Sequence, residues 1–235
     1  MIERCPLIEL VEILAQWSRQ ARPPHSASTS VQDNQPAFAL PARAPRTRIR
    51  LLHVNRREQI LATAAELFAA RGFHGVSVSE IGAACGISGP ALYKHFPAKD
   101  AVLAAMLVGI SEDLLSEGLR RVAADPRPQP ALEALIEWHL DFAINHRALI
   151  VVQERDWESL PADAREKVRT LQREYVDLWA AQLRALDPDL SLARARTITH
   201  ANFGLLNSTP HSSLVPAEQL HEVLTQMSRR CLGLA

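Results

Sequence analysis

The sequence has no apolar run of about 18 to 20 residues, the length that a helix needs to cross a bilayer. Its first twenty residues do not have the pattern of a secretory signal, because Glu3, Glu9 and Glu12 stand where a signal would be basic and then apolar. Cysteine occurs only three times, at spacings that fit no metal site, which argues against a disulfide framework. These absences predict a cytoplasmic protein.

Glycine is also sparse, with 9 residues, whereas 47% of the 235 residues are hydrophobic. That apolar content is sufficient for a sizeable core. The apolar residues repeat with a period nearer 3.6 than 2, so almost every segment is expected to be helical. The sequence therefore predicts an all-α protein.

The formal net charge is zero, but the charge is unevenly distributed along the chain. Residues 46–100 hold eight Arg and Lys against four acids, whereas residues 101–235 hold 14 against 18. A basic segment is the electrostatic footprint expected of a region that meets phosphate groups. We therefore expect any nucleic-acid contact to lie within residues 46–100.

The first 52 residues differ in composition from the rest and are predicted to be an extension, mostly a disordered linker. Residues 6–20 fit a short amphipathic helix, and residues 21–45 carry five prolines among polar residues and alanines. Val54 could reflect a GTG start codon, which leads to the hypothesis that the native chain starts at position 54. If the extension is native, its arginines could form an arm along phosphate or in a minor groove.

Three helices are expected between residues 55 and 97. The first spans about 55–71, the second starts with a capping box at 77–80 and ends at Gly86, and the third starts at Ser88 and ends before Pro97. The second and third helices are short, and the turn between them contains glycine and isoleucine. This spacing is typical of a helix-turn-helix, whose second helix enters the major groove.

The start of the third helix is suited to close contact with DNA. Small residues there let the helix N-terminus, with its free N–H groups and positive dipole end, approach bases and phosphates: Ser88, Gly89 and Pro90. Polar groups for the DNA backbone follow at Tyr93, Lys94 and His95. An alternative from the pattern alone is that Tyr93 and Phe96 are core aromatic residues of a helical bundle.

Residues 55–102, NRREQILATAAELFAARGFHGVSVSEIGAACGISGPALYKHFPAKDAV, resemble the N-terminal DNA-binding domain of TetR family regulators along their whole length. The resemblance implies a DNA-binding domain at 53–100 and a ligand-binding and dimerisation domain at 101–235. It also implies phosphate contacts at the start of the second helix, base contacts at the start of the third, and backbone contacts beyond it: Ser77 and Ser79; Ser88, Gly89 and Pro90; Tyr93, His95 and Lys99.

Beyond a long helix from Ala98 to Asp125, periodicity predicts helices near 131–146, 148–158, 162–186, 190–207 and 216–232. The resemblance implies that 190–207 and 216–232 form the dimer interface, a four-helix bundle. Small residues there suit either close helix approach between two copies or an intramolecular core: Ala193, Ala195, Ala201 and Gly204. A dimer would place two recognition helices about one DNA turn apart and bind a palindromic operator.

Aromatic and polar residues in the apolar central helices are candidates for an effector pocket, although each also fits an ordinary core: Trp138, His139, Phe142, Trp157, Tyr175, Trp179, Asn202 and Phe203. His139 and His146 are seven residues apart but have no evident third ligand, so no metal and no cofactor are predicted. No nucleophile–base pair or phosphate loop is present to indicate an enzyme.

The segment 203–213, FGLLNSTPHSS, resembles actinobacterial family members associated with acyl-CoA, fatty-acid or branched-chain catabolism. An acyl-CoA or similar metabolite is therefore the preferred effector, ahead of a drug-like hydrophobic molecule. The leading hypothesis is a ligand-responsive homodimeric repressor. The alternative is an architectural or global DNA-binding protein without an effector, which would bind many sites with steep salt dependence.

Overall fold

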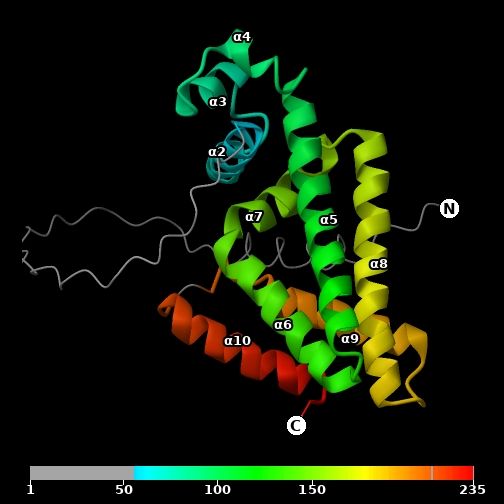
Figure 1. The fold of residues 1–235 in the computed structure, drawn as a ribbon. Helices are drawn as coiled ribbons and strands as arrows, with labels where there is room; N and C mark the ends of the chain where they lie inside the picture. Colours follow the sequence, from blue (N-terminus) through cyan, green and yellow to red (C-terminus); the bar gives the residue numbers. More distant parts are fainter. Residues whose placement is uncertain (1–55, 213, 235) are drawn as a thin grey trace, which may run out of the picture.

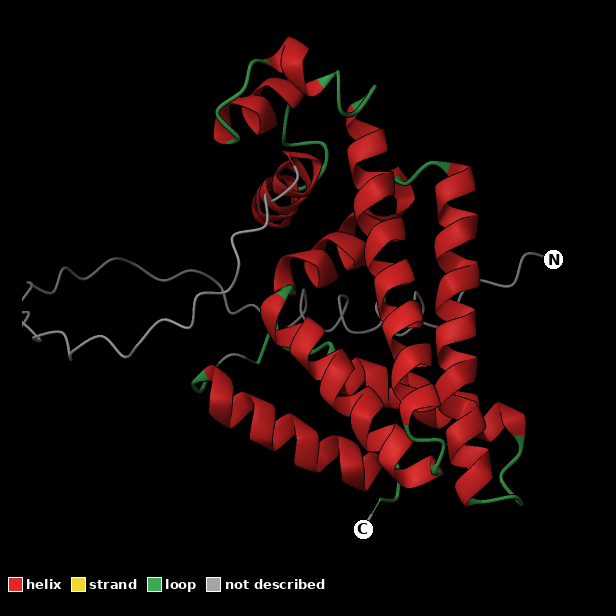
Figure 2. Ribbon diagram, viewed as in Figure 1, coloured by secondary structure: helices red, strands yellow, loops and turns green. Residues whose placement is uncertain are grey.

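The computed structural model describes residues 56–212 and 214–234, and all regular secondary structure within them is helical (Figures 1 and 2). The elements are α2 (Arg56–Arg71), α3 (Val78–Ala84), α4 (Gly89–Leu92), α5 (Lys99–Ala124), α6 (Pro128–Asn145), α7 (Arg147–Asp156), the 3-10 turn η1 (Trp157–Ser159), α8 (Ala162–Leu186), α9 (Leu192–Leu206) and α10 (Ala217–Cys231). The all-α prediction is confirmed for this part of the chain. The predicted extension, its helix at 6–20, the Asn55 start and the Val54 hypothesis lie outside the described residues.

Helices α2, α3 and α4 form a small unit at one end of α5 (Figure 1). Its core contains Ile60, Ala64 and Phe68 of α2 together with Ile81 and Leu92, all fully buried. The three α2 residues recur every four positions and so lie along one helix face. This unit has the predicted helix-turn-helix arrangement.

The other helices form the larger unit, in which α5 and α8 run side by side and α6 packs against both (Figure 1). Helices α9 and α10 pack against α8 and α6. The largest fully buried side chain in this unit is Trp179 of α8, in a core that also contains Leu135 and Leu140 of α6. In the described residues, no helix combines the length and hydrophobicity needed to span a membrane.

The two units share a hydrophobic core at their junction. The cluster that contains Phe68 of α2 continues through Val152 of α7 to Trp157 and Val168. At this junction Arg155 of α7 donates hydrogen bonds to the carbonyls of Phe68 and Ala69, in the last turn of α2. The shared core and these hydrogen bonds join α7 directly to α2.

Most helix boundaries lie within a few residues of those predicted, and two differences have a physical reason. The third helix was expected to run two turns, but α4 has four residues, and single turns continue it to Phe96. Helix α6 starts at Pro128, three residues before the predicted start near 131. Both of its first-turn prolines, Pro128 and Pro130, are tolerated because the N–H groups of the first helical turn have no intrahelical partner.

Candidate DNA interface and effector site

Side-chain caps fix the N-termini of α3 and α4. The Glu80 backbone N–H donates to Ser77 Oγ at 3.2 Å, and the Ser77 backbone N–H donates to Glu80 Oε2 at 2.8 Å, a reciprocal capping box. These Ser77 hydrogen bonds, together with Arg71, lower the pKa of the Glu80 carboxyl to about 2. Ser88 Oγ accepts from the Ala91 N–H at 3.3 Å and caps α4.

The turn between α3 and α4 depends on two glycines. Gly86 has a φ of +68°, in the left-handed region where a side chain is unfavourable. At Gly82 an added Cβ would lie 3.0 Å from the Ile87 carbonyl oxygen, and the Ile87 N–H donates to the Gly82 carbonyl at 2.9 Å. This close approach sets α4 against α3.

Most predicted DNA-contacting residues of this unit are accessible to solvent. Those exposed are Ser77, Ser79, Ser88, Pro90, Tyr93, Lys94 and His95, whereas Gly89 and Lys99 are half-buried. Tyr93 is 53% exposed and Phe96 is 2% exposed. Of the two residues for which a core role was the alternative, only Phe96 belongs to the core.

Lys99, at the start of α5, makes contacts within the unit. Its Nζ donates to the carbonyls of Phe73 and Val76, at 2.7 and 2.9 Å, and lies 4.2 Å from the centroid of the Phe73 ring. These interactions close the loop between α2 and α3 over the start of α5. Lys99 therefore positions the helix-turn-helix on α5, whatever contact it also makes with DNA.

Five of the predicted pocket residues form one buried aromatic cluster between α6, α8 and α9. The His139 ring stacks on Phe203 at 4.6 Å between centroids and on Tyr175 at 5.8 Å. Phe142 and Trp179 meet the same imidazole edge to face. We call His139, Phe142, Tyr175, Trp179 and Phe203 the aromatic cluster.

Polar atoms in and beside this cluster lack partners, although their side chains are at most 4% exposed. Within the described residues, four such atoms make no hydrogen bond: His139 Nδ1, Tyr175 Oη, Trp179 Nε1 and Asn202 Nδ2. Each unpaired buried polar group costs about 1 to 3 kcal/mol. A concentration of such groups at one place is a candidate ligand site.

Burial also changes the titration of these groups. It lowers the pKa of His139 to about 4, although the hydrogen bond between its Nε2 and Asn207 Oδ1, at 3.0 Å, opposes the change. Burial raises the pKa of Tyr175, an effect that the nearby Trp179 indole partly offsets. The cluster is therefore neutral at pH 7.

Of the other three predicted pocket residues, Trp138 and Trp157 lie elsewhere and Asn202 lies beside the cluster. Trp138 is half-buried, donates from Nε1 to the Leu114 carbonyl at 3.3 Å and packs under Arg121, so it is a helix–helix contact. Trp157 belongs to the core at the junction of the two units. Asn202 neighbours Phe203 on α9, and its Oδ1 accepts from Ser228 Oγ of α10 at 2.6 Å.

Two residues that position the cluster were not predicted. Asn207 follows α9 and holds His139 through its amide oxygen. Gly118 of α5 admits the Tyr175 ring, because a Cβ there would lie 2.9 Å from Tyr175 Cε2. A glycine inside a long helix is a signal of close approach, whereas a single asparagine after a helix carries no distinctive pattern.

The apolar residues of α10 lie on two different faces. Leu220 and Leu224 are buried in the core, whereas Val223 is 49% exposed and Met227 is 46% exposed. On α9, Ala193 and Ala201 are exposed, but Ala195 is fully buried. For Ala195 the structure therefore favours the second alternative, an intramolecular core, because its side of α9 packs inward.

In residues 56–212 and 214–234, no three His, Cys, Asp or Glu side chains gather in a way that could hold a metal ion. The predicted site residues gather mainly in two places, the exposed helix-turn-helix surface and the buried aromatic cluster. The first offers capped helix N-termini and polar side chains to a phosphate backbone. The second offers unpaired hydrogen-bonding groups within an apolar, aromatic environment.

Two family models match the two units. The model for bacterial regulatory proteins of the tetR family matches residues 60–106, and a tetracyclin repressor-like C-terminal domain matches residues 125–211. A crystal structure of a TetR-family transcriptional regulator from Bordetella parapertussis 12822 has a TM-score of 0.67 and 27% sequence identity, covering 75% of this chain and 95% of that one.

Curated relatives agree with these matches. The HTH-type transcriptional repressor KstR2 of Rhodococcus jostii is 30% identical over 131 residues, covering 55% of this chain and 64% of that protein. The HTH-type transcriptional activator FasR of Mycolicibacterium smegmatis is 35% identical over 136 residues, covering 55% of this chain and 60% of that protein. The match thus spans less than two thirds of the length of either relative.

Proposed function

The chain belongs to the TetR family of DNA-binding transcriptional regulators, and on this premise we propose that it is a homodimeric repressor released from a palindromic operator by a small effector. Residues 53–100 are the DNA-binding domain and residues 101–235 the effector-binding and dimerisation domain. The observation that carries the proposal is the pairing of an exposed helix-turn-helix with a buried cluster of unpaired polar groups.

For DNA, we assign the contacts to the exposed surface around α3 and α4. Ser77 and Ser79 contact phosphate at the start of α3, and Ser88, Gly89 and Pro90 bring the start of α4 close to the bases. The remaining contacts go to the DNA backbone: Tyr93, Lys94, His95 and Lys99. For Lys99 the internal hydrogen bonds give a second role, in positioning the unit.

For dimerisation, the exposed apolar residues of α10 support an interface formed by 190–207 and 216–232. Val223 and Met227 are about half exposed, one turn apart, on the face of α10 opposite the core. Exposed Ala193 and Ala201 permit close approach along α9. Such a two-fold contact would present two α4 segments to successive major grooves.

For the effector, the chemistry of the aromatic cluster supports a neutral apolar group that carries a hydrogen-bond acceptor. Trp179 Nε1 and Asn202 Nδ2 can only donate, and Tyr175 Oη can donate as well. A carbonyl or hydroxyl oxygen would satisfy these donors, and the acyl thioester of an acyl-CoA is one such group. A carboxylate is disfavoured, because the site has no buried cation to pair with it.

Effector binding requires the cluster to open, since its rings are in mutual contact. Helix α6 carries His139 and Phe142, and α7, which follows it directly, caps α2 through Arg155. A ligand that separates α6 from α8 would shift α7 and with it the DNA-binding unit. The shift favours an arrangement in which the two α4 segments no longer match the groove spacing.

The test is a footprint of the purified full-length chain on the DNA upstream of its own gene, at physiological salt, with and without acyl-CoAs of several chain lengths. We expect a protected palindrome that an acyl-CoA releases. Protection everywhere would support the architectural alternative, and tighter protection with acyl-CoA would indicate an activator, the role named for the FasR relative.

Tyr93→Ala tests the DNA surface, with Leu119→Ala as the matched control because Leu119 of α5 is equally exposed, at 51%. We expect operator affinity to fall about tenfold for Tyr93→Ala and to stay unchanged for the control, while both variants remain dimeric by size-exclusion chromatography. Equal affinities for the two variants would show that the assigned contacts are wrong.

A further inference from the structure

The hydrogen bond between His139 and Asn207 determines which nitrogen of the imidazole carries the hydrogen. Asn207 presents its amide oxygen, Oδ1, at 3.0 Å from His139 Nε2. An amide oxygen can only accept a hydrogen bond, so Nε2 carries the hydrogen and donates it. Because burial lowers the pKa of His139 to about 4, the ring is neutral at pH 7 and its other nitrogen has a free lone pair. His139 Nδ1 is therefore a hydrogen-bond acceptor and not a donor.

This acceptor is buried and has no donor in the described part of the chain. His139 is only 3% exposed, and its Nδ1 makes no hydrogen bond. The donors on two neighbouring rings, Trp179 Nε1 and Tyr175 Oη, are themselves without partners, so neither of them donates to Nδ1. A buried acceptor that stays unpaired destabilises the free protein, and a ligand that donates to it would remove that cost.

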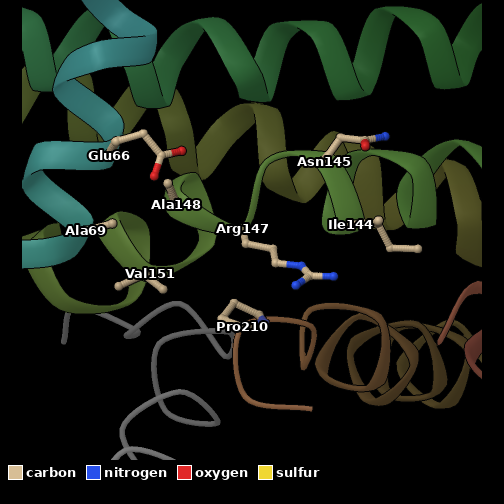
Figure 3. Close-up of a pocket in the computed structure, with 8 residues that line it drawn as sticks. All are labelled: Glu66, Ala69, Ile144, Asn145, Arg147, Ala148, Val151 and Pro210. Atoms are coloured by element: carbon tan, nitrogen blue, oxygen red, sulfur yellow. The ribbon is translucent and has the colours of Figure 1, made fainter. Parts of the chain in front are cut away.

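A surface hollow of about 440 Å³ lies beside the segment that carries Asn207, but it does not supply the missing donor. Ile144 and Asn145 at the end of α6 line it, together with Pro210 in the segment that follows Asn207 (Figure 3). None of the aromatic cluster residues lines this hollow. The hollow therefore does not open His139 Nδ1 to solvent, and a donor for it has to enter the cluster itself.

Unpaired donors lie next to this acceptor. The centroid of the His139 ring is 5.8 Å from that of Tyr175 and 6.2 Å from that of Trp179, and the Tyr175 and Trp179 centroids are 6.1 Å apart. Trp179 Nε1 can only donate, whereas the Tyr175 hydroxyl can donate or accept. Since each hydrogen bond spans about 2.8 to 3.0 Å, rings at this spacing suit a ligand whose own donor and acceptor are a few bonds apart.

On the premise that this cluster is the effector site proposed above, we propose that the effector carries a hydroxyacyl group. Its hydroxyl donates to His139 Nδ1, and its carbonyl oxygen accepts from Trp179 Nε1 or the Tyr175 hydroxyl. A plain acyl chain would satisfy the donors but leave the acceptor unpaired. His139 therefore determines specificity for the hydroxyl, and Asn207 is the positioning residue that fixes its tautomer.

A hydroxyl suits this site better than an amine, which could also donate to His139 Nδ1. An amine is protonated at pH 7, and an ammonium buried without an anion is strongly unfavourable. Among the buried residues that the structure describes, the one acidic side chain is Asp156, which pairs with Arg155 at the junction of the two units. The cluster thus offers an ammonium no counter-charge.

The experiment compares ligands that differ in one hydroxyl, by isothermal titration of the full-length chain. One pair is hexanoyl-CoA and 3-hydroxyhexanoyl-CoA, and the other is methyl hexanoate and methyl 3-hydroxyhexanoate, which lack coenzyme A. We expect the hydroxylated member of each pair to bind about tenfold more tightly. In 6-hydroxyhexanoyl-CoA the hydroxyl is at the far end of the chain and should give no gain over hexanoyl-CoA.

Three variants make the assignment specific. His139→Phe keeps a stacked ring but removes the acceptor, so the ratio of affinities within each pair should fall from about ten to about one. His146→Phe, which removes an exposed imidazole at the end of α6, is the matched control and should keep the ratio. Asn207→Leu removes the oxygen that fixes the tautomer and should lower the ratio. Circular dichroism checks that each variant is folded.

The tautomer can be read without a ligand. A long-range proton–nitrogen correlation spectrum of the natural chain, with the His139 signals assigned through His139→Phe, should show hydrogen on Nε2, and Asn207→Leu should alter those signals. Hydrogen on Nδ1 in the natural chain would overturn the inference.

The ligand pairs separate this inference from the proposed function. Equal affinities within both pairs would refute the hydroxyl requirement and leave the acyl effector in place. Methyl esters that differ about tenfold, with no binding of either CoA thioester, would support the hydroxyl requirement and refute an acyl-CoA effector. Binding by none of the probes would overturn both.

Discussion

The polar groups that position the DNA-binding unit have partners, whereas several residues of the aromatic cluster in the regulatory domain each have one buried polar atom without a partner. Around α3 the backbone N–H groups of Ser77 and Glu80 and the ammonium of Lys99 all have partners. In the cluster, His139, Tyr175 and Trp179 each have an orphaned atom at almost complete burial. Paired groups make the DNA-binding unit rigid. Unpaired buried groups destabilise the free protein, and a ligand that forms hydrogen bonds with them would remove that cost.

The largest effect expected from this difference in pairing is a dependence of stability on pH, which is due to His139. Its pKa falls from about 6.5 in an unfolded chain to about 4 in the fold, so the unfolded state binds more protons between these values. The free energy of unfolding is therefore not reduced by His139 above pH 6.5. It falls as the pH drops from 6.5 toward 4, by roughly 3 kcal/mol in total.

The measurement is the free energy of unfolding in urea between pH 4 and 7, compared between the natural chain and His139→Phe. The variant keeps a stacked ring but does not titrate, so its stability should fall less steeply over this range. Parallel pH profiles for the two proteins would show that His139 is not held in its neutral form by burial.

In the DNA-binding unit the largest loss should come from Lys99. Lys99→Met removes two charge-assisted hydrogen bonds to the carbonyls of Phe73 and Val76 and should destabilise the unit by about 2 kcal/mol. Lys94→Met removes the same charge from an exposed position and should leave stability unchanged. Thermal unfolding without DNA distinguishes the two, and equal melting temperatures would contradict the positioning role.

A smaller loss is expected from the capping box. Ser77→Ala removes the acceptor for the Glu80 N–H and should cost about 1 kcal/mol. Ser79→Ala, two residues on and also exposed, lacks a capping role in this structure and is the control. Hydrogen exchange of the α3 amides should become faster only in Ser77→Ala; similar exchange in both variants would contradict the assigned cap.

How far the sequence could predict these two regions follows from the range of their interactions. The capping box, the turn at Gly86 and the helix order depend on neighbouring residues, and local patterns predicted them. The partners of Lys99, Trp157 and Asn207 lie 23 to 68 positions away or in another helix, so only packing determines them. An apolar stripe such as that of α10 likewise cannot tell which of its residues meet the core and which are exposed.

The smallest expected effect is a gain of stability where the other substitutions cause a loss, and it concerns the aromatic cluster. Tyr175→Phe deletes a buried hydroxyl that makes no hydrogen bond and retains the ring that stacks on His139. It should therefore leave stability unchanged or raise it by about 1 kcal/mol.

The same variant should respond less to an effector, because the donor for the ligand oxygen is gone. Urea unfolding measures the stability of the variant, and release of the operator by acyl-CoA measures its response to the effector. A variant that loses stability would show that the hydroxyl is paired in solution, and one that gains stability but keeps its full response would place the effector elsewhere. Gained stability with a weakened response would show that the unpaired hydroxyl is maintained for ligand binding at the expense of the free protein.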